Sequence, residues 1–318
     1  MQLNKICVLG GSGFVGSAIV AKLDAAGYAV TVLTRRRESA KHLFLLPNVT
    51  VVECNVLDYH ALNVVLRGMD AVINLIGILH QSHHASFNAV HHQLPAQLAK
   101  ICVDLGIKRL LQMSSLGAAE HAPSQYLRTK ASGEAALHTL QDKINITIFK
   151  PSIIFGRGDN FTNLFATLIK CLPVILLAKP NAKFQPIWVE DVASCFVRSI
   201  ENTSTYGQTY ELAGPKVYSF RALLQQIMQA LAVERPIIGL NDTLSYLQAL
   251  MMEFLPVKLM SRDNVKSMEV DSISQQTLPA IFAVELSTLE AVLPEYLADR
   301  NARGAYDRYR RVAARSRY

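Results

Sequence analysis

The fold is decided by the stretch Gly10-Gly11-Ser12-Gly13-Phe14-Val15-Gly16, which follows an apolar run ending at Leu9 and precedes an amphipathic segment extending to Gly27. The apolar run predicts a buried strand, and the amphipathic segment predicts a helix. A glycine-rich turn between a strand and a helix is typical of a site that binds the diphosphate of a dinucleotide.

Each glycine has a separate expected role in such a turn. Gly10 permits the tight turn, Gly13 lets the backbone approach a diphosphate, and Gly16 allows the helix to pack closely on the sheet. The free N–H groups and the positive dipole at the helix N-terminus attract the anion. We therefore predict dinucleotide contacts from the residues of this turn, which are Gly10, Ser12, Gly13, Phe14, Val15 and Gly16.

Short apolar runs alternate with segments of helical periodicity along the first half of the chain. The runs cover residues 3–9, 28–34, 49–54, 70–76, 108–114 and 145–150. This alternation is typical of parallel strands joined by crossover helices. The sequence predicts an α/β protein with a Rossmann doubly wound parallel sheet and a smaller, mainly helical C-terminal lobe.

Prolines punctuate the chain more often beyond Lys150, and the regular alternation weakens there. We predict a dinucleotide-binding domain at residues 1–213, of which residues 156–183 contribute to a substrate lobe. Residues 214–318 are expected to form the helical substrate or partner lobe. That lobe ends in a basic tail, because seven of the arginines lie between residues 300 and 317 of a chain whose net charge is +7.

The second predicted strand ends at Thr34 and is followed by three arginines. Proteins that prefer NAD usually place an acidic residue here, which binds the ribose 2′-hydroxyl. Arg35 or Arg36 suits a 2′-phosphate instead, so NADP(H) is the predicted cofactor and NAD(H) the alternative. The competing interpretation is a solvated loop of arginines.

Two further strand ends are candidate cofactor contacts. Asn55 and Val56 follow the third predicted strand, where an adenine ring would lie, and the fourth ends in Leu75, Ile76 and Gly77. The carboxyl ends of parallel strands border the ligand crevice of this fold. The alternative is that all five are ordinary strand and turn residues.

A candidate catalytic set follows the fifth predicted strand. Ser115 lies at its end, and Tyr126 and Lys130 lie four residues apart on the next predicted helix, so they share one face. A free phenol has a pKa of about 10, so it exchanges protons near neutrality only beside a cation. We expect Lys130 to stabilise the phenolate and bind the nicotinamide ribose, while Ser115 holds a substrate oxygen for proton transfer.

The sequence resembles the extended and atypical short-chain dehydrogenases in GGSGFVG, in the Ser115, Tyr126 and Lys130 set, and in KPSIIFG at residues 150–156. The resemblance implies that Pro151, Ser152 and Ile153 contact the cofactor. More narrowly, the chain is similar to the nucleotide-binding accessory subunit of respiratory complex I and its bacterial relatives. The segments that carry this likeness are YLRTK with Gly133-Glu134, KPSIIFGRGDNF, QPIWVEDV at residues 185–192 and SRDNV at residues 261–265.

That family implies tightly held NADPH, often without turnover, and in mitochondrial members a stabilising role near the membrane surface. This chain keeps all three candidate catalytic residues, which favours redox chemistry. Three hypotheses remain: an NADPH-dependent oxidoreductase on a carbonyl or alcohol, a non-catalytic accessory protein of a membrane respiratory complex, and a nucleotide-sugar epimerase or dehydratase. No motif identifies the substrate.

Other features of the sequence limit which metals, membranes and macromolecules are expected as partners. Five histidines follow the fourth predicted strand without acidic or thiol partners, which argues against a metal site, although His91 is expected to face the nicotinamide ribose. The start of the chain lacks the pattern of a secretory signal, so we expect a cytoplasmic protein. Residues 244–259 are expected to fill the substrate lobe or, together with the basic tail, to dock on anionic lipid or a partner subunit. Nucleic acid is not an expected partner, because the basic residues lack interleaved stacking aromatics.

Overall fold

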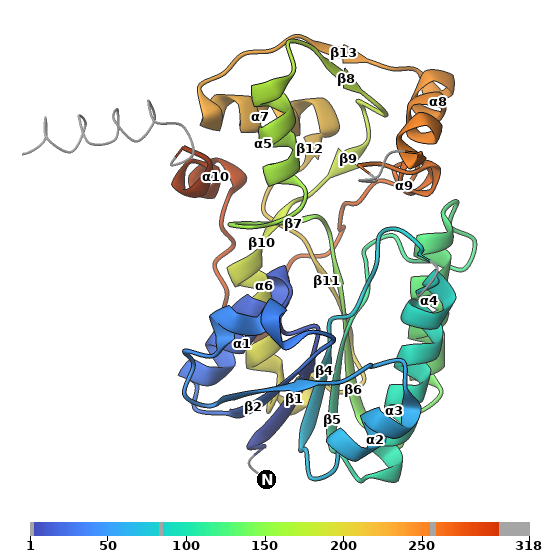
Figure 1. Ribbon diagram of the computed structural model, residues 1–318, viewed down its shortest axis with the longest axis vertical. Coiled ribbons are helices and arrows are strands. Elements are labelled where there is room, and N and C mark those ends of the chain that lie inside the picture. The colour runs from blue at the N-terminus through green and yellow to red at the C-terminus, as the bar shows by residue number, and fades with distance from the viewer. Residues whose placement is uncertain (1–2, 83–84, 255–258, 299–318) are drawn as a thin grey trace, which may run out of the picture. The chain divides into compact units, whose positions relative to one another are not determined.

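The computed structural model describes residues 3–82, 85–254 and 259–298. It divides the chain into two compact units (Figure 1). The first contains Met1–Ser152, Val189–Leu212 and Ser274–Glu285, and the second contains Ile153–Trp188, Ala213–Ile273 and Leu286–Tyr318. None of the helices in the described ranges is both long enough and apolar enough to cross a bilayer.

The first unit is built on a parallel sheet whose described strands follow the order β3-β2-β1-β4-β5-β6-β11 (Figure 1). This order confirms the predicted doubly wound sheet. The strands are β1 (Lys5–Leu9), β2 (Ala29–Thr34), β3 (Val49–Glu53), β4 (Ala71–Asn74), β5 (Arg109–Met113), β6 (Asn145–Pro151) and β11 (Thr209–Leu212). The direction of progression reverses between β1 and β4, and ligands of open α/β sheets bind at such a switch point.

The strand register brings the candidate cofactor residues to one edge of the sheet. Leu9 of β1 pairs with Leu33 of β2 and with Asn74 of β4. The glycine turn, the arginines after β2 and the residues after β4 therefore leave the sheet side by side.

Helices cover both faces of this sheet. Figure 1 shows α1 (Phe14–Ala25) and α6 (Val189–Ser199) on one face, with α2 (Tyr59–Val65), α3 (Leu94–Asp104) and α4 (Gln125–His138) on the other. Short helical turns complete the unit: the 3-10 turns η1 (Arg37–Leu43), η3 (Thr203–Thr205) and η4 (Ala280–Phe282), and the π-helical turn η2 (Ala89–Gln93), which runs directly into α3. The central strands β1, β4, β5 and β6 are largely buried between these layers, which accounts for their continuous apolar runs, whereas the outer strands β3 and β11 are only partly buried.

The chain returns to the first unit at residues 274–285, although the predicted division at residue 213 assigned this segment to the C-terminal lobe. The ring of Phe282 is fully buried, with its centroid 6.0 Å from that of Phe149 and 4.9 Å from that of Tyr210. Arg198 donates hydrogen bonds to the carbonyl oxygens of Phe282 and Ala283. Aromatic burial and these bonds hold the segment against the sheet.

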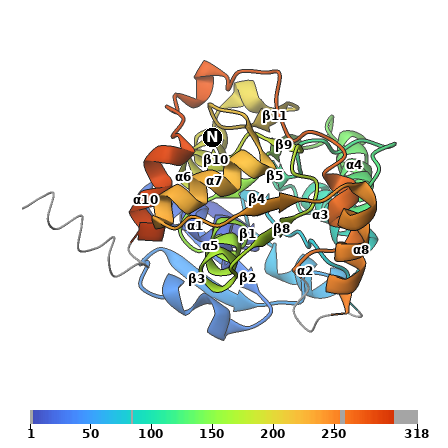
Figure 2. The ribbon, with the colours of Figure 1, turned by 90° about the horizontal axis from the view of Figure 1, so that it is seen from above.

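The second unit combines short strand pairs with helices. Its strands are β7 (Ile154–Phe155), β8 (Ile175–Leu177), β9 (Lys183–Phe184), β10 (Ile187–Trp188), β12 (Tyr218–Ser219) and β13 (Ile237–Gly239), and its helices are α5 (Thr162–Cys171), α7 (Phe220–Leu231), α8 (Asp242–Glu253), α9 (Arg262–Ser267) and α10 (Leu289–Leu297). β8 and β13 run side by side in Figure 2. A cluster of packed rings from Phe161, Phe165, Phe184 and Phe220 forms part of its core.

The expectation that residues 244–259 fill the interior of the lobe is wrong for α8. This helix buries Ser245 and Ala249, while Leu244, Leu247 and Met251 are exposed. Residues 255–258 and the basic tail lie outside the described residues. The apolar surface of α8 is therefore available to a partner.

Candidate dinucleotide and active site

The glycine turn has the geometry that a diphosphate site needs. Gly10 has a φ of +80°, a left-handed conformation that favours glycine. A Cβ on Gly16 would lie 2.2 Å from the carbonyl oxygen of Gly10, so only glycine lets α1 begin this close to the turn. Gly13 caps α1 without a side-chain hydrogen bond, which leaves the helix N-terminus open to an anion.

The arginines after β2 point away from the core. Arg35 and Arg36 are both exposed. The hydroxyl of Thr34 donates to the carbonyl oxygen of Arg36 (3.0 Å) and accepts the backbone N–H of the same residue (3.3 Å). The next residue, Arg37, donates its backbone N–H to Glu53 on the neighbouring strand (2.6 Å). These bonds fix the bend in the backbone while both preceding guanidinium groups stay free to meet a ligand charge.

The structure separates the remaining predicted cofactor residues into exposed and buried ones. Leu75 and Ile76 lie against Gly10, and Gly77 is exposed at the same edge. Asn55 is exposed and its side chain accepts the N–H of Leu57, whereas the side chain of Val56 is part of the apolar core.

Pro151 and Ser152 are buried at the end of β6, where the Ser152 N–H donates to Leu212 of β11 (2.9 Å). Ile153 belongs to the second unit, and its cofactor contact stays a prediction.

Ser115, Tyr126 and Lys130 come together at the carboxyl end of β5. α4 begins just before the tyrosine, because the side chain of Ser124 caps it by accepting the N–H of Leu127 (3.2 Å). Tyr126 forms a side-chain hydrogen bond with Ser115. The Nζ of Lys130 lies 5.9 Å from the centroid of the Tyr126 ring and donates to the carbonyl oxygen of Met113 (3.4 Å).

Burial tunes the two titrating groups in opposite directions. It raises the pKa of the Tyr126 phenol, and the bond to Ser115 partly offsets this. Burial lowers the pKa of Lys130 to about 8, while the charge of Glu134 acts to raise it. Near neutral pH Lys130 therefore remains mostly charged, and it is the cation that a phenolate at Tyr126 would require.

His91 forms one wall of this site. Its Nε2 accepts the N–H of Ile78 (3.1 Å), and its Nδ1 bonds the hydroxyl of Thr129 (3.1 Å). Its ring meets the Tyr126 ring edge-on, with centroids 5.2 Å apart. Burial and then the charge of Lys130 lower the pKa of His91 to about 3. The imidazole is therefore neutral near pH 7 and carries its proton on Nδ1.

Sequence reasoning did not assign a role to Gly133, the glycine inside α4. A Cβ at this position would lie 2.0 Å from the carbonyl oxygen of His91. The π-helical turn η2, which contains His91, packs on α4 at this point. A glycine in a helix interior is unfavourable by itself, and that cost was the available signal.

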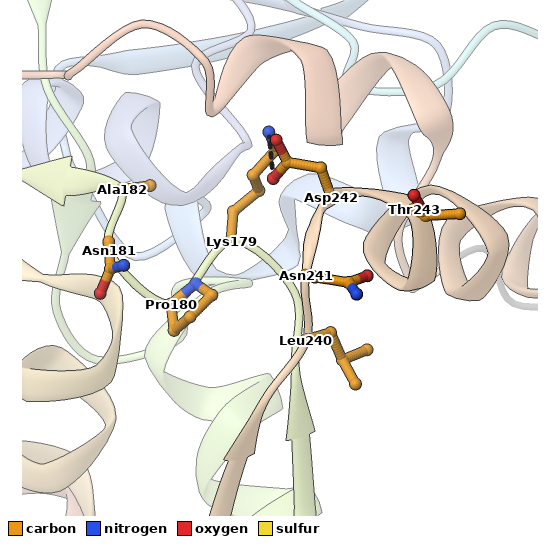
Figure 3. A pocket seen from close by; sticks show the side chains of 8 residues that line it. All are labelled: Lys179, Pro180, Asn181, Ala182, Leu240, Asn241, Asp242 and Thr243. Atoms are coloured by element: carbon orange, nitrogen blue, oxygen red, sulfur yellow. Dashed lines mark ion pairs between the residues drawn. The ribbon is translucent and has the colours of Figure 1, made fainter.

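A separate pocket of about 500 Å³ lies in the second unit (Figure 3). Lys179 forms an ion pair with Asp242 across it (2.9 Å) and has a left-handed backbone with a φ of +46°. Its lining residues are Lys179, Pro180, Asn181, Ala182, Leu240, Asn241, Asp242 and Thr243. No sequence motif predicted this pocket, and none of the candidate catalytic residues lines it.

The sheet order, the glycine turn and the serine, tyrosine and lysine at the end of β5 define a Rossmann protein of the short-chain dehydrogenase type. The chain belongs to the NAD dependent epimerase/dehydratase family, whose model matches residues 6–213.

Two curated proteins and one solved structure show the range of its relatives. The chain is 30% identical over 298 residues to NADH dehydrogenase [ubiquinone] 1 alpha subcomplex subunit 9, mitochondrial, of Arabidopsis thaliana, a match that covers 90% of this chain and 73% of that protein. It is 28% identical over 193 residues to a ceramide reductase of Caulobacter vibrioides, covering 60% of this chain and 59% of the relative. A UDP-glucose 4-epimerase of Thermotoga maritima superposes with a TM-score of 0.70 and 16% identity, covering 92% of this chain and 97% of that structure.

Proposed function

We propose that the chain is an NADPH-dependent oxidoreductase that reduces a carbonyl group, or oxidises the corresponding alcohol, at Ser115, Tyr126 and Lys130. The observation that carries the proposal is the hydrogen bond between Ser115 and Tyr126 beside the buried ammonium of Lys130. The nicotinamide, when bound, supplies or accepts the hydride.

Each protein group has a distinct part in the proposed reduction. Ser115 hydrogen-bonds the carbonyl oxygen, and Tyr126 transfers its phenolic proton to that oxygen. Lys130 stabilises the phenolate left behind, and the neutral His91 packs against the tyrosine ring without competing for the proton. In the oxidation direction the same groups act in reverse.

The exposed arginines support NADP(H) over NAD(H). A charge-assisted hydrogen bond is worth about 1.5–3 kcal/mol, so Arg35→Ser and Arg36→Ser together should raise the Kd for NADPH about tenfold to hundredfold and change that for NADH far less. Calorimetric titration of both cofactors measures this. Arg67→Ser, an exposed arginine at the end of α2, serves as the control. Equal affinities of the unaltered protein for the two cofactors would contradict the NADPH assignment.

We further propose a lipid-like carbonyl, including quinone-like or isoprenoid compounds, as the substrate class. The likeness to a protein named ceramide reductase supports this choice. NADPH oxidation should therefore be followed with long-chain ketones and a quinone, and the conversion of a nucleotide sugar should be followed by chromatography of its products, because epimerisation and dehydration consume no cofactor. Consumption of NADPH with a lipid ketone or quinone alone is the expected result, and exclusive conversion of the nucleotide sugar would instead favour the epimerase or dehydratase hypothesis.

The second candidate function is a non-catalytic NADPH-binding protein that supports a membrane respiratory complex. The likeness to a mitochondrial NADH dehydrogenase subunit over 90% of the chain favours it. The two functions separate in one experiment, because an accessory protein should retain copurified NADPH during incubation with every compound of the panel. Retained but unoxidised cofactor would replace the reductase proposal with this one.

Either function is compatible with a peripheral contact with the membrane through α8. Four exposed apolar side chains recur along this helix at intervals of three or four residues: Leu244, Leu247, Met251 and Phe254. Gln248 of α8 donates to the carbonyl oxygen of Leu176 (3.0 Å), and the side chain of Leu176 is exposed beside its strand partner Ile238. α8 thus contacts β8, and we propose that the exposed apolar side chains of α8, β8 and β13 dock on anionic lipid together with the basic tail.

Vesicle sedimentation tests the proposed membrane contact. Burying one large apolar side chain is worth about 1.5–3 kcal/mol, so Met251→Glu and Phe254→Glu should each weaken binding to anionic vesicles about tenfold or more. Val64→Glu, which changes an exposed valine on α2, should not. Absence of vesicle binding by the full chain would rule the contact out.

A further inference from the structure

A partly buried ion pair lies next to the serine, tyrosine and lysine site. Glu134 of α4 and Lys150 of β6 are joined by an Oε2 to Nζ distance of 3.0 Å, and their side chains are 12% and 15% exposed. The other carboxylate oxygen of Glu134 accepts the hydroxyl of Ser114. Both oxygens of the carboxylate are therefore occupied, one by the residue that follows β5 and the other by a lysine of β6.

This pair acts on the backbone on either side of Ser115. Ser114 is held by its bond to Glu134 and by donating its N–H to the carbonyl oxygen of Phe149 (2.7 Å), and Leu116 donates its N–H to Pro151 (2.9 Å). Lys150 lies between Phe149 and Pro151 in β6 and donates a hydrogen bond to the carbonyl oxygen of Ala118 (3.1 Å). Ser115 thus sits on a strand end held from both sides.

The same carboxylate is placed to act on Lys130. Tyr126, Lys130 and Glu134 follow one another at intervals of four residues and share one face of α4. The ammonium groups of Lys130, which is buried, and of Lys150, which is partly buried, therefore lie near a single carboxylate. His91 also faces Lys130 from η2, but it is neutral across the range in which lysines titrate.

We propose that Glu134, paired with Lys150, is a positioning residue that holds the strand end carrying Ser115 and keeps Lys130 protonated for Tyr126. The carboxylate stabilises the ammonium of Lys130, and Lys150 opposes it as a like charge. This inference deepens the proposed function and rests on it, but its charge effect exists without cofactor or turnover.

The test is the titration of Lys130 itself, followed by nuclear magnetic resonance in protein labelled with carbon-13 at the lysine side chains. The Lys130 signal is assigned by its loss in Lys130→Met. Glu134→Gln should lower the pKa of Lys130 from about 8 by about one unit, a tenfold loss of proton affinity, and Lys150→Gln should raise it. The double variant should titrate close to the unaltered protein.

A purely structural role gives a different pattern. Loosening the site would hydrate Lys130 and raise its pKa in both single variants, because burial is what depresses it. Glu134→Asp keeps the negative charge, so the pKa of Lys130 should be higher in this variant than in Glu134→Gln. Glu120 is exposed, and Glu120→Gln should leave the pKa of Lys130 unchanged. The proposal is overturned if Glu134→Gln leaves the pKa of Lys130 unchanged or raises it. If Glu134→Gln does not fold, an unchanged pKa of Lys130 in Lys150→Gln overturns the proposal instead.

Because the titration of Lys130 is done without cofactor, it distinguishes failure of the proposed function from failure of this inference. A protein that neither binds nor oxidises NADPH refutes the proposed function and leaves the charge coupling measurable. A protein that turns over normally while Lys130 is indifferent to Glu134 refutes only this inference.

Discussion

Tyr126→Phe should reduce the rate of substrate-dependent NADPH oxidation by about 10²–10⁴-fold, the usual contribution of a positioned general acid or base. The phenyl ring keeps the packing against Phe87 and His91, whose centroids lie 6.1 Å and 5.2 Å from that of Tyr126. It loses the hydroxyl, and with it the hydrogen bond to Ser115 and the proton that passes to the substrate oxygen. The folded state and the binding of NADPH should therefore survive. Steady-state rates and calorimetric titration of the same preparation measure the two quantities.

The matched control for this variant is Tyr59→Phe, which removes a hydroxyl from an exposed tyrosine on α2. It should leave the rate of NADPH oxidation unchanged. An active Tyr126→Phe protein would show that the phenol takes no part in turnover. Binding without any turnover in either protein would favour the accessory function.

Gly133→Ala should destabilise the protein by about 3 kcal/mol, the upper end of the usual cost of overpacking. The new Cβ would lie 2.0 Å from the carbonyl oxygen of His91, a backbone atom that no rotamer change can move. Relief requires η2 and α4 to separate, which would draw His91 away from Tyr126 and weaken cofactor binding as well. Denaturant unfolding and NADPH titration measure both effects.

The neighbouring Ser132→Ala tests whether the loss is specific to the contact with η2. Ser132 is exposed on α4, and the loss of its hydroxyl group should change the free energy of unfolding by about 0.5 kcal/mol or less. A Gly133→Ala protein with the stability of the Ser132→Ala protein would show that the two helical segments can part without cost. Alanine is otherwise the better helix former, so the expected sign is opposite to that of intrinsic propensity.

Six of the described strands of the first unit were predictable because each is a short apolar run, and the central ones are nearly continuously apolar because they are buried on both faces. The run predicted at residues 145–150 is β6 at Asn145–Pro151, and the run at residues 49–54 is β3 at Val49–Glu53. Residues 220–231 carry apolar side chains at helical spacing, and they form α7. These patterns repeat over neighbouring residues, so they are visible without knowledge of long-range contacts.

The partners of Glu134 and the protonation state of His91 were not accessible in the same way. The bond from Ser114 to Glu134 joins residues 20 positions apart, and the ion pair with Lys150 joins β6 to α4. The neutrality of His91 arises from its burial beneath α4 and from the charge of Lys130. A lone glutamate or histidine in a sequence gives no sign of such partners.

The exposed side chains of α8 also could not be predicted from the sequence. Its leucines and methionines and the phenylalanine that follows favoured a helix that fills the substrate lobe, because apolar residues at helical spacing usually face a core, and docking on lipid or a partner was the alternative. In the structure the small side chains of Ser245 and Ala249 face inward instead. Which side of a helix is covered depends on the surface offered by the rest of the fold.

By itself the sequence determined the parallel sheet, the glycine turn at Gly10–Gly16 and the set of Ser115, Tyr126 and Lys130, because local periodicity and short spacing encode strands, turns and helix faces. Only the tertiary structure decided which groups are buried together: Glu134 with Lys150, and His91 with Gly133. The physical reason is that desolvation and Coulomb interaction depend on distance in space, and packing alone brings together residues that are far apart along the chain.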